Sequence, residues 1–355
     1  MFSVMPSWNT VKPLGRTHQR PDALWLCFSG SGAEFMFHGS RCDVTIAGDD
    51  NASPSGRDDL VRIAIYVDGV RVVDEMIDAQ EKTFTALDAA EARDVTVRIV
   101  KLSETAMSTC GIRAISVDDP DGIRPTPARA RRIEIIGDSI TCGYGVDDEV
   151  AEHHFSTTTE DVTRAYAYRM AEMLDADYSM ASISGYGIIS GYTATGEEKV
   201  TAQQLPRFYE KLGFSYGAFR ELRAEDVRWD FGAFVPQIVV INLGTNDDSY
   251  TRDDPARREE YRTAYVGFLK VVRRNNPDAV ILCTLGVMGD RLYPMVEQAA
   301  ADYAAQTGDD NIRCMRFDVQ RPEDGYVADW HPTAVTHGKA AMKLAEEIRG
   351  IMGWA

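Results

Sequence analysis

The pattern of apolar residues changes about a third of the way along the chain, and this change constrains the fold most strongly. The first part contains short runs rich in β-forming residues: Leu24–Phe28, Glu34–Phe37, Asp43–Ile46, Arg62–Val67, Val70–Glu75, Thr83–Ala86, Val95–Leu102 and Ile112–Val117. Asp68-Gly69, between two of these runs, is a strong signal for a two-residue hairpin. Short strands with no helical period between them predict an antiparallel, all-β sandwich of jelly-roll-like character.

After the first third, apolar strands alternate with helical segments. The predicted strands are Ile133–Ile136, Tyr178–Ile183, Ile238–Leu243, Val280–Leu285 and Ile312–Phe317, and the predicted helices are Thr163–Leu174, Pro255–Arg274, Arg291–Gln306 and Ala334–Met352. Uniformly apolar strands separated by helices predict an α/β domain with a parallel sheet covered by helices on both faces. The segment Asp118–Ala130 is rich in proline and charge and is typical of a linker. We therefore predict a β-sandwich at 1–120, a linker at 121–131 and an α/β domain at 132–355.

Length and composition restrict the possible partners and location. A chain of 355 residues suits two domains, and its net charge of −17 argues against nucleic acid and anionic membranes as partners. Met1–Arg16 lacks a basic start followed by an apolar run, and no apolar stretch reaches the roughly 18 residues of a membrane span. The six cysteines show no metal-ligand spacing and favour buried free thiols over disulfides. We expect a cytoplasmic protein, with unconventional export and the oligomeric state left open.

The first candidate for chemistry is Gly137-Asp138-Ser139, directly after the predicted strand Ile133–Ile136. Reactive groups in an open parallel sheet collect at the carboxyl ends of the strands. Glycine permits a tight turn there, and a serine that opens a helix can direct both its hydroxyl and its backbone N–H at a substrate. The alternative is that Asp138 or Ser139 only caps a helix.

Two further polar segments follow other predicted strands. In Gly244-Thr245-Asn246-Asp247, the asparagine amide can donate a hydrogen bond to an oxyanion, whereas Asp247 could be a helix cap. In Asp329-Trp330-His331-Pro332, the histidine has a close acidic neighbour, and its ordinary pKa of about 6.5 suits a general base.

The remaining histidines give no comparable pattern. His153 and His154 lie beside Glu149 and Glu152, but adjacent histidines point in different directions, so we read this segment as a solvated loop and not a metal site. His337, on the predicted last helix, is interpreted as structural. No metal ion or organic cofactor is therefore expected.

Together these segments resemble the SGNH (GDSL-type) hydrolase superfamily, whose blocks are GDS, a glycine, GxND and a carboxylate with a histidine near the C-terminus. The resemblance implies that Ser139 is the nucleophile and His331 the general base. It also implies an oxyanion hole formed by the backbone N–H groups of Ser139 and Gly185 and the side-chain amide of Asn246. Gly187 is the competing candidate for the glycine block.

The last block departs from the superfamily pattern. The acid usually stands three residues before the histidine, and that position is Ala328 here. The nearest carboxylate is Asp329, two residues before His331. Either Asp329 reaches Nδ1 of His331 and completes a triad, or a backbone carbonyl orients His331 in a Ser–His dyad.

Other features narrow the resemblance to carbohydrate esterase family 2. They are Pro13–Arg16, the run Trp25–Gly32 followed by Glu34-Phe35, and the DWHP end. This resemblance implies a serine esterase that removes O-acetyl groups from sugars or oligosaccharides, including xylan-type ones. Trp330 would then stack against a sugar ring, although a core-edge aromatic is an alternative, and Tyr186 and Tyr192 are further substrate-binding candidates.

Two other functions stay open. The first is an SGNH lipase or thioesterase for longer acyl esters, which would need a long apolar channel. The second is a carbohydrate-binding protein without catalysis, against which the presence of Ser139, Asn246 and His331 argues.

Overall fold

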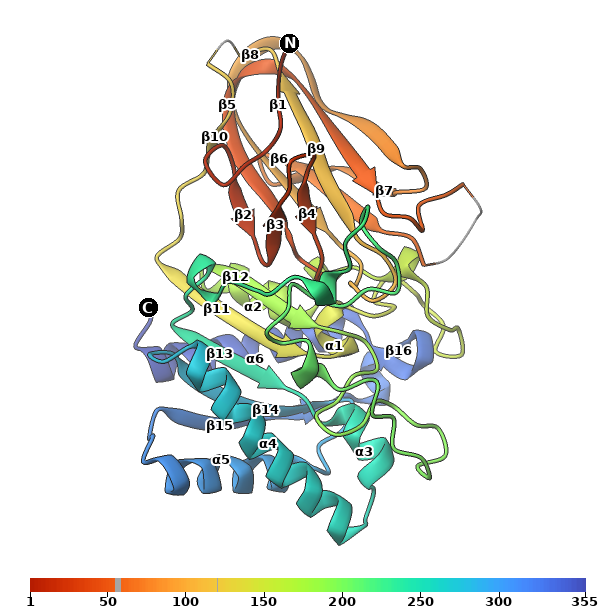
Figure 1. Ribbon diagram of the computed structural model, residues 1–355, viewed down its shortest axis with the longest axis vertical. Helices are drawn as coiled ribbons and strands as arrows, with labels where there is room; N and C mark the ends of the chain where they lie inside the picture. The colour runs from red at the N-terminus through yellow and green to blue at the C-terminus, as the bar shows by residue number, and fades with distance from the viewer. Residues whose placement is uncertain (55–58, 120) are drawn as a thin grey trace. The chain divides into compact units, whose positions relative to one another are not determined.

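The chain forms two compact units, each assembled from separate stretches of sequence. The computed structural model describes residues 1–54, 59–119 and 121–355 (Figure 1); residues 55–58 and Pro120, which falls in the predicted linker segment, lie outside the description. The β unit contains Met1–Arg129, Ser156–Glu160 and Lys211–Trp229, and the α/β unit contains Ala130–Phe155, Asp161–Glu210 and Asp230–Ala355.

The β unit is built on one antiparallel sheet. Its strands are β1 (Phe2–Val4), β2 (Lys12–Leu14), β3 (Thr17–Gln19), β4 (Leu24–Leu26), β5 (Gly32–Gly48), β6 (Arg62–Val67), β7 (Val70–Met76), β8 (Glu81–Lys101), β9 (Cys110–Val117) and β10 (Arg124–Pro125). The main order is β3-β4-β9-β5-β8-β6-β7, with β1 paired to β9 and both β2 and β10 paired to β5. The predicted antiparallel β domain is confirmed. β10 lies in the segment predicted as a linker, where Thr126 also donates a hydrogen bond to Glu34 at 2.6 Å.

β5 and β8 each join two runs that the sequence suggests as separate strands. In β5 the side chains that join the apolar core fall on odd positions before a register shift around Gly39–Asp43 and on even positions after it. The members of the core on the two sides are Ala33, Phe35 and Phe37, then Cys42, Val44 and Ile46. A bulge inserts a residue and so inverts the side-chain alternation. Both halves of the long strand thereby contribute to the same apolar core.

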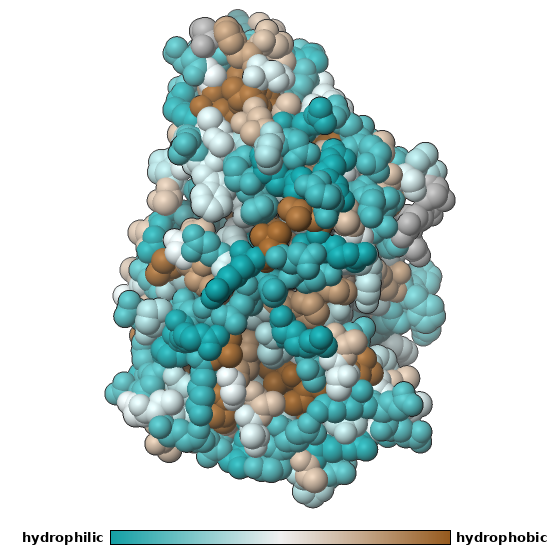
Figure 2. Space-filling model, in the orientation of Figure 1, coloured by the Kyte–Doolittle hydropathy of each residue, from teal (hydrophilic) through white to brown (hydrophobic). Residues whose placement is uncertain are grey.

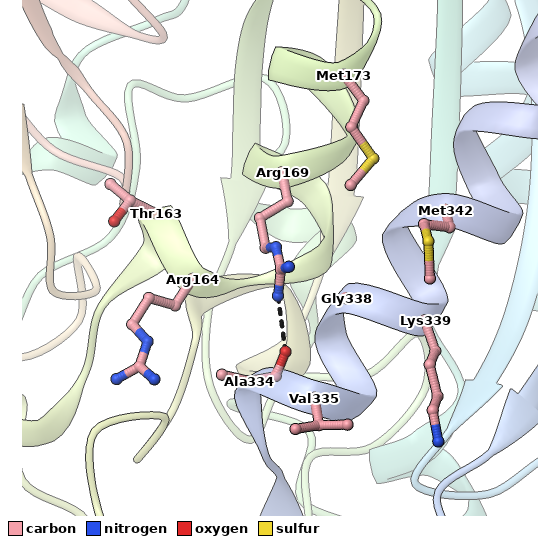
Figure 3. A pocket seen from close by; sticks show the side chains of 9 residues that line it. All are labelled: Thr163, Arg164, Arg169, Met173, Ala334, Val335, Gly338, Lys339 and Met342. Carbon is pink, nitrogen blue, oxygen red and sulfur yellow. Dashed lines mark hydrogen bonds between the residues drawn. The ribbon is translucent and has the colours of Figure 1, made fainter.

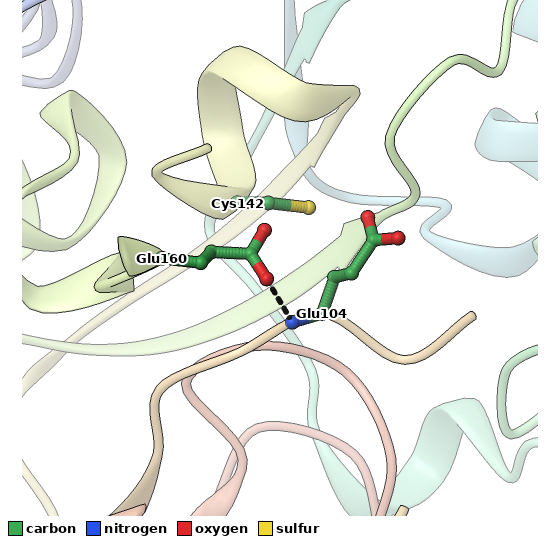
Figure 4. A group of neighbouring side chains, drawn as sticks. All are labelled: Glu104, Cys142 and Glu160. Carbon is green, nitrogen blue, oxygen red and sulfur yellow. Dashed lines mark hydrogen bonds between the residues drawn. The ribbon is translucent and has the colours of Figure 1, made fainter. Parts of the chain in front are cut away.

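Two segments from the predicted α/β range complete the β unit. Phe219 stacks on Trp25 with ring centroids 5.4 Å apart, and the fully buried Arg16 donates a hydrogen bond to the Lys211 carbonyl at 2.8 Å. Figure 4 shows the Glu160 carboxylate, which accepts the backbone N–H of Glu104 at 2.7 Å. Burial, reinforced by the neighbouring Glu104, raises the pKa of Glu160 well above its ordinary value.

The α/β unit has a five-stranded, fully parallel sheet in the order β12-β11-β13-β14-β15. The strands are β11 (Arg131–Gly137), β12 (Ala176–Ser182), β13 (Ile238–Asn242), β14 (Val280–Val287) and β15 (Ile312–Val319). The helices are α1 (Ser139–Cys142), α2 (Tyr166–Met173), α3 (Thr245–Thr251), α4 (Pro255–Asn275), α5 (Tyr293–Thr307) and α6 (Ala334–Met352). α4 packs with α5 on one face of the sheet and α2 with α6 on the other (Figure 1). The predicted α/β fold is confirmed.

The pairing of α2 with α6 fixes the start of the last helix. Arg169 of α2 donates a hydrogen bond to the Ala334 carbonyl at 2.7 Å (Figure 3). A Cβ at Gly338 would lie 2.9 Å from the Arg169 guanidinium, so glycine leaves room for this side chain. The segment just before α6, which carries His331, is therefore held from α2.

The surface agrees with the acidic, polar composition. Most of the face in Figure 2 is covered by hydrophilic residues, and hydrophobic residues form small separate patches. In the described part of the chain, no helix combines the length and apolarity needed to cross a membrane. All six cysteines are free thiols.

Candidate active site

The three polar segments singled out in the sequence meet at one cavity of the α/β unit. Ser139 follows β11, Asn246 follows β13, and His331 stands before α6. In this strand order the direction of the chain connections reverses between β11 and β13, which is where open α/β sheets bind ligands. The cavity has a volume of about 540 Å³, and Ser139, Gly185, Asn246 and His331 all line it.

Local backbone geometry presents Ser139 to the cavity. Ser139 is the first residue of α1, and Asp138 caps this helix by accepting the Ile140 N–H at 3.1 Å. A Cβ at Gly137 would lie only 2.0 Å from Thr141 Oγ1, so the tight turn requires glycine. Capping and catalysis were alternatives for this tripeptide. The structure assigns the cap to Asp138 and leaves the Ser139 hydroxyl directed at His331.

Ser139 and His331 form a hydrogen-bonded pair. Ser139 Oγ lies 2.9 Å from His331 Nε2, and both residues are buried. Burial lowers the pKa of His331 to about 4, against the opposing effect of the Ala328 carbonyl, so the imidazole is neutral near pH 7. A neutral imidazole at this distance can accept the serine proton.

The Ala328 backbone carbonyl, and not the Asp329 carboxylate, occupies the position at His331 Nδ1. The carbonyl oxygen lies 3.1 Å from Nδ1, which corresponds to the dyad alternative. The Asp329 carboxylate instead accepts a hydrogen bond from the Tyr144 hydroxyl and lies 2.9 Å from His154 Nδ1. The two-residue offset puts Asp329 in a left-handed turn with φ of 50°, and this turn directs its side chain away from Nδ1. The predicted triad geometry is therefore corrected.

Gly185 and Asn246 border the cavity beside Ser139. The Asn246 amide donates to the Tyr186 carbonyl at 2.9 Å and lies 3.4 Å from Asp138 Oδ2, which fixes its orientation. The competing Gly187 uses its N–H to bind the Gln203 carbonyl at 3.1 Å. Gly185 is therefore the better candidate for an oxyanion donor.

Asp247 organises the loop that carries Gly185. Its buried carboxylate accepts the backbone N–H groups of Ile188, Ile189 and Ser190 at 2.8, 2.7 and 3.1 Å. Burial raises the pKa of Asp247 to about 6 in spite of these hydrogen bonds. Burial, with a contribution from Asp247, likewise raises the pKa of Asp138 to about 7.

The aromatic residues predicted to bind substrate differ in how far their side chains are exposed to solvent. Trp330 is 54% exposed and Tyr192 is 60% exposed, and both line the cavity. Tyr186 is only 2% exposed and packs edge-on against Phe208. The burial of this ring, outside the cavity lining, does not fit the predicted role of Tyr186 in substrate binding, whereas its backbone carbonyl accepts a hydrogen bond from the Asn246 amide.

The other histidines have structural surroundings. His153 Nδ1 lies 3.0 Å from Asp148, and His337 is buried, with its Nδ1 accepting the Tyr166 N–H at 3.1 Å. His154 was not predicted to contact the site, but its ring contacts Asp329, which lines the cavity. Tyr144, which also lines the cavity, was missed because its role depends on contacts with residues almost two hundred positions away.

The comparisons with known proteins agree with this geometry. The model of the GDSL-like lipase/acylhydrolase family matches residues 135–339, and that of the carbohydrate esterase 2 N-terminal domain matches residues 14–127. The cellulase/esterase CelE of Acetivibrio thermocellus is 32% identical over 342 residues, which are 94% of this chain and 38% of CelE. The chain thus spans well under half the length of that relative.

Two further similarities cover nearly the whole chain. An acetylxylan esterase/glucomannan deacetylase of Cellvibrio japonicus is 24% identical over 97% of this chain and 89% of its own length. A solved family two carbohydrate esterase from Clostridium thermocellum, in complex with cellohexaose, matches with a TM-score of 0.82 and 28% identity, over 97% of this chain and 100% of that one. The chain therefore belongs to the GDSL-like lipase/acylhydrolase family and carries the N-terminal domain of carbohydrate esterase family 2.

Proposed function

We propose that this protein is a serine esterase that removes O-acetyl groups from acetylated sugars or oligosaccharides. The observation that carries the proposal is the hydrogen bond between Ser139 Oγ and His331 Nε2, 2.9 Å long, in a cavity that Gly185 and Asn246 also line. A serine, a neutral imidazole and oxyanion donors are the groups that acyl transfer to water requires.

In the first step Ser139 Oγ attacks the acetyl carbonyl and His331 Nε2 takes the serine proton. The Ala328 carbonyl accepts a hydrogen bond from Nδ1–H, which keeps the proton on Nδ1 and leaves Nε2 free to act as the base. The tetrahedral oxyanion is stabilised by the backbone N–H groups of Ser139 and Gly185 and by the amide of Asn246. Loss of one such donor typically costs roughly 10²–10³ in turnover.

In the second step the C–O bond to the sugar breaks, and His331 returns the proton to the departing sugar oxygen. Acetyl-Ser139 remains. Water then attacks the acetyl carbonyl while His331 removes a proton from the water. His331 passes this proton to Ser139 Oγ as the serine ester breaks, which releases acetate and restores the Ser139 hydroxyl.

The lining of the cavity supports a polar substrate. Trp330 and Tyr192 offer exposed aromatic faces, and Asp248 and Arg291 contribute charged groups. The relatives include an acetylxylan esterase/glucomannan deacetylase and a carbohydrate esterase with bound cellohexaose, which favours acetylated plant-type polysaccharides or their fragments as substrates. The apolar side chains of Leu285, Met288 and Leu292 also line the cavity and make a longer acyl group the alternative to test.

The test is acetate release from a panel of acetylated xylo-, gluco- and manno-oligosaccharides by wild type and Ser139→Ala. We expect wild type to release acetate and the variant to be slower by about 10⁴-fold or more, because the nucleophile acts in every turnover. Octanoate and acetate esters of one aryl alcohol are compared in parallel. Preference for octanoate would contradict the acetyl specificity, and an active Ser139→Ala would contradict the role of Ser139 as the nucleophile.

The cytoplasmic location stays a proposal that fractionation of the native host would test.

A further inference from the structure

His331 is restrained on its face as well as at its two nitrogens. The ring of Tyr144 stacks on the imidazole, with centroids 3.9 Å apart and planes inclined by 17°. Phe155 packs against Tyr144, with ring centroids 4.8 Å apart. Rotation of the imidazole about the Cα–Cβ and Cβ–Cγ bonds of His331 is therefore opposed by the Tyr144 ring, which Phe155 in turn supports.

Tyr144 also reaches the backbone that orients His331. Its hydroxyl donates to the Asp329 carboxylate, whose other oxygen lies 2.9 Å from His154 Nδ1. These hydrogen bonds lower the pKa of Asp329, against the opposing effect of its partial burial, so the carboxylate stays ionised and remains a strong acceptor.

Asp329 and Trp330 need such support because both are in the left-handed region, with φ of 50° and 62°. Non-glycine residues adopt this conformation only when their surroundings enforce it. The Asp329 N–H binds the His153 carbonyl at 2.8 Å, and the Trp330 N–H binds the Ala151 carbonyl at 3.3 Å. This strained turn lies between Ala328, which supplies the carbonyl, and His331, which receives it.

Gly145, the residue after Tyr144, lies close to the start of the same turn. A Cβ at Gly145 would lie 2.8 Å from the Ala328 Cβ, so glycine allows the Tyr144 backbone to approach Ala328 closely. The short segment of Tyr144 and Gly145 thus touches His331, Ala328 and Asp329.

We propose that Tyr144 is a positioning residue for the general base. Its ring covers His331, and its hydroxyl, acting through Asp329, holds the turn that presents the Ala328 carbonyl to Nδ1. The inference rests on the proposed function of Ser139 and His331. When His331 takes the serine proton it becomes a cation beneath an aromatic face, an arrangement that favours the charged form. Tyr144 is therefore expected to act on turnover more than on substrate affinity.

The test is a double-mutant cycle with Tyr144→Phe and Asp329→Gly, assayed on an aryl acetate and on an acetylated xylo-oligosaccharide. Glycine replaces Asp329 because it adopts φ of 50° without strain. Tyr144→Phe should lower kcat about 10-fold on both esters with KM nearly unchanged, and Tyr144→Leu, which also removes the ring, about 100-fold. The double variant should be no slower than the slower single variant, because both changes break one path.

Tyr303→Phe is the matched control. It removes another tyrosine hydroxyl of the α/β unit that is hydrogen-bonded to a carboxylate, Asp309, at 2.8 Å, outside the cavity. We expect it to keep wild-type kcat. Melting temperatures are recorded for every variant. If Tyr144→Leu does not fold, the comparison of Tyr144→Phe with wild type still tests the inference.

Three results would overturn the inference while leaving the proposed function intact. They are an unchanged kcat in both Tyr144 variants, losses that simply multiply in the double variant, and a defect confined to the sugar ester, which would make Tyr144 a substrate contact. A wild-type protein inactive on both esters would overturn the proposed function, and this inference with it.

Discussion

At His331, burial and hydrogen bonding act on one imidazole in opposite directions. Burial disfavours the charged ring and is the larger effect, whereas the Ala328 carbonyl favours it, and the resulting pKa is about 4 in place of the ordinary 6.5. The carbonyl carries no full charge. It therefore fixes the tautomer of His331 but raises the pKa less than a carboxylate at Nδ1 would. The charge and the backbone of Asp329 make smaller contributions that also favour the charged ring.

The low pKa of His331 predicts the pH at which activity is lost on the acid side. Since the neutral imidazole is the base, kcat/KM for an aryl acetate should fall with a midpoint near pH 4, by about tenfold per pH unit below it. Asp247 and Asp138, with pKa values of about 6 and 7, titrate above this limb. A pH–rate profile with circular dichroism at each pH checks the prediction. A midpoint near 6.5 in folded protein, persisting in Asp247→Asn, would contradict it.

The same shift has a consequence for stability. The folded pKa of His331 lies below its ordinary value, so the unfolded chain binds the proton more readily between these two values. The stability contributed by the neutral ring is therefore complete above about pH 6.5 and declines as the pH falls toward 4. The buried His337, whose pKa burial lowers to about 3, acts in the same direction.

At the scale of elements, the loop after β12 depends on a helix that follows another strand. Asp247 lies in the first turn of α3, and its carboxylate receives three backbone N–H groups of the loop. The sequence offered helix capping as an alternative for Asp247. Its carboxylate instead serves the backbone of a distant loop, and through it Gly185.

We predict that Asp247→Asn weakens both activity and stability. The asparagine NH2 would face one of the loop N–H groups, donor against donor, which costs roughly 1–3 kcal/mol. Displacement of Gly185 should lower kcat about 10- to 100-fold. Calorimetry and aryl acetate kinetics measure the two effects. Asp254→Asn is the control, because Asp254 also accepts two backbone N–H groups, at the start of α4, and asparagine caps helices equally well. Wild-type kinetics in Asp247→Asn would exclude this role for the loop.

The elements differ in how far the sequence could predict them. Apolar strands such as Ile238–Asn242 and the helix Ala334–Met352 follow from local patterns and were predicted within a residue or two. β5 was predicted as two strands, because the bulge near Gly39–Asp43 interrupts the alternation that marks a single strand. β1, β2 and β3, at three residues each, are too short to carry a pattern.

The candidate site shows the same division. Ser139, Asn246 and His331 were found because strand ends in a parallel sheet converge, so local motifs define a common location. Tyr144 and the direction of the Asp329 side chain depend on positive φ angles and on the Asp148–His154 loop, which no local pattern encodes. The burial of the Tyr186 ring was not predicted either, because the turns of a glycine-rich loop hide which side chains are buried.

At the scale of the whole molecule, the two units are interleaved in sequence. Ser156–Glu160 and Lys211–Trp229 belong to the β unit although the chain around them belongs to the α/β unit. Their buried side chains include Phe219, at 0% exposure, and Trp229, at 6%. Both have partners in the first 129 residues, because Phe219 stacks on Trp25 and the Arg16 guanidinium lies over the Trp229 ring.

We therefore predict that a fragment of residues 130–355 does not fold as a stable enzyme. Each large apolar side chain left without partners loses about 1.5–3 kcal/mol of burial free energy and exposes an apolar surface that is prone to aggregation. The fragment should bind a hydrophobic dye and lack a cooperative melting transition, and co-expression with residues 1–129 should restore both solubility and aryl acetate activity. A fragment that melts cooperatively at the temperature of the full chain would show that the two segments are dispensable.

This interleaving also governs the order of events during synthesis. When Arg129 leaves the ribosome, the β unit still lacks two of its three pieces, and the last one ends only at Trp229. At roughly 5–20 residues per second, the missing stretch takes about 5–20 s to be made. During that interval the nascent sheet exposes the surfaces that Phe219 and Trp229 will cover. The partly folded β unit must therefore stay able to bind Ser156–Glu160 and Lys211–Trp229 when they are made. Cellular chaperones that shield apolar surface have their greatest opportunity to act in this interval.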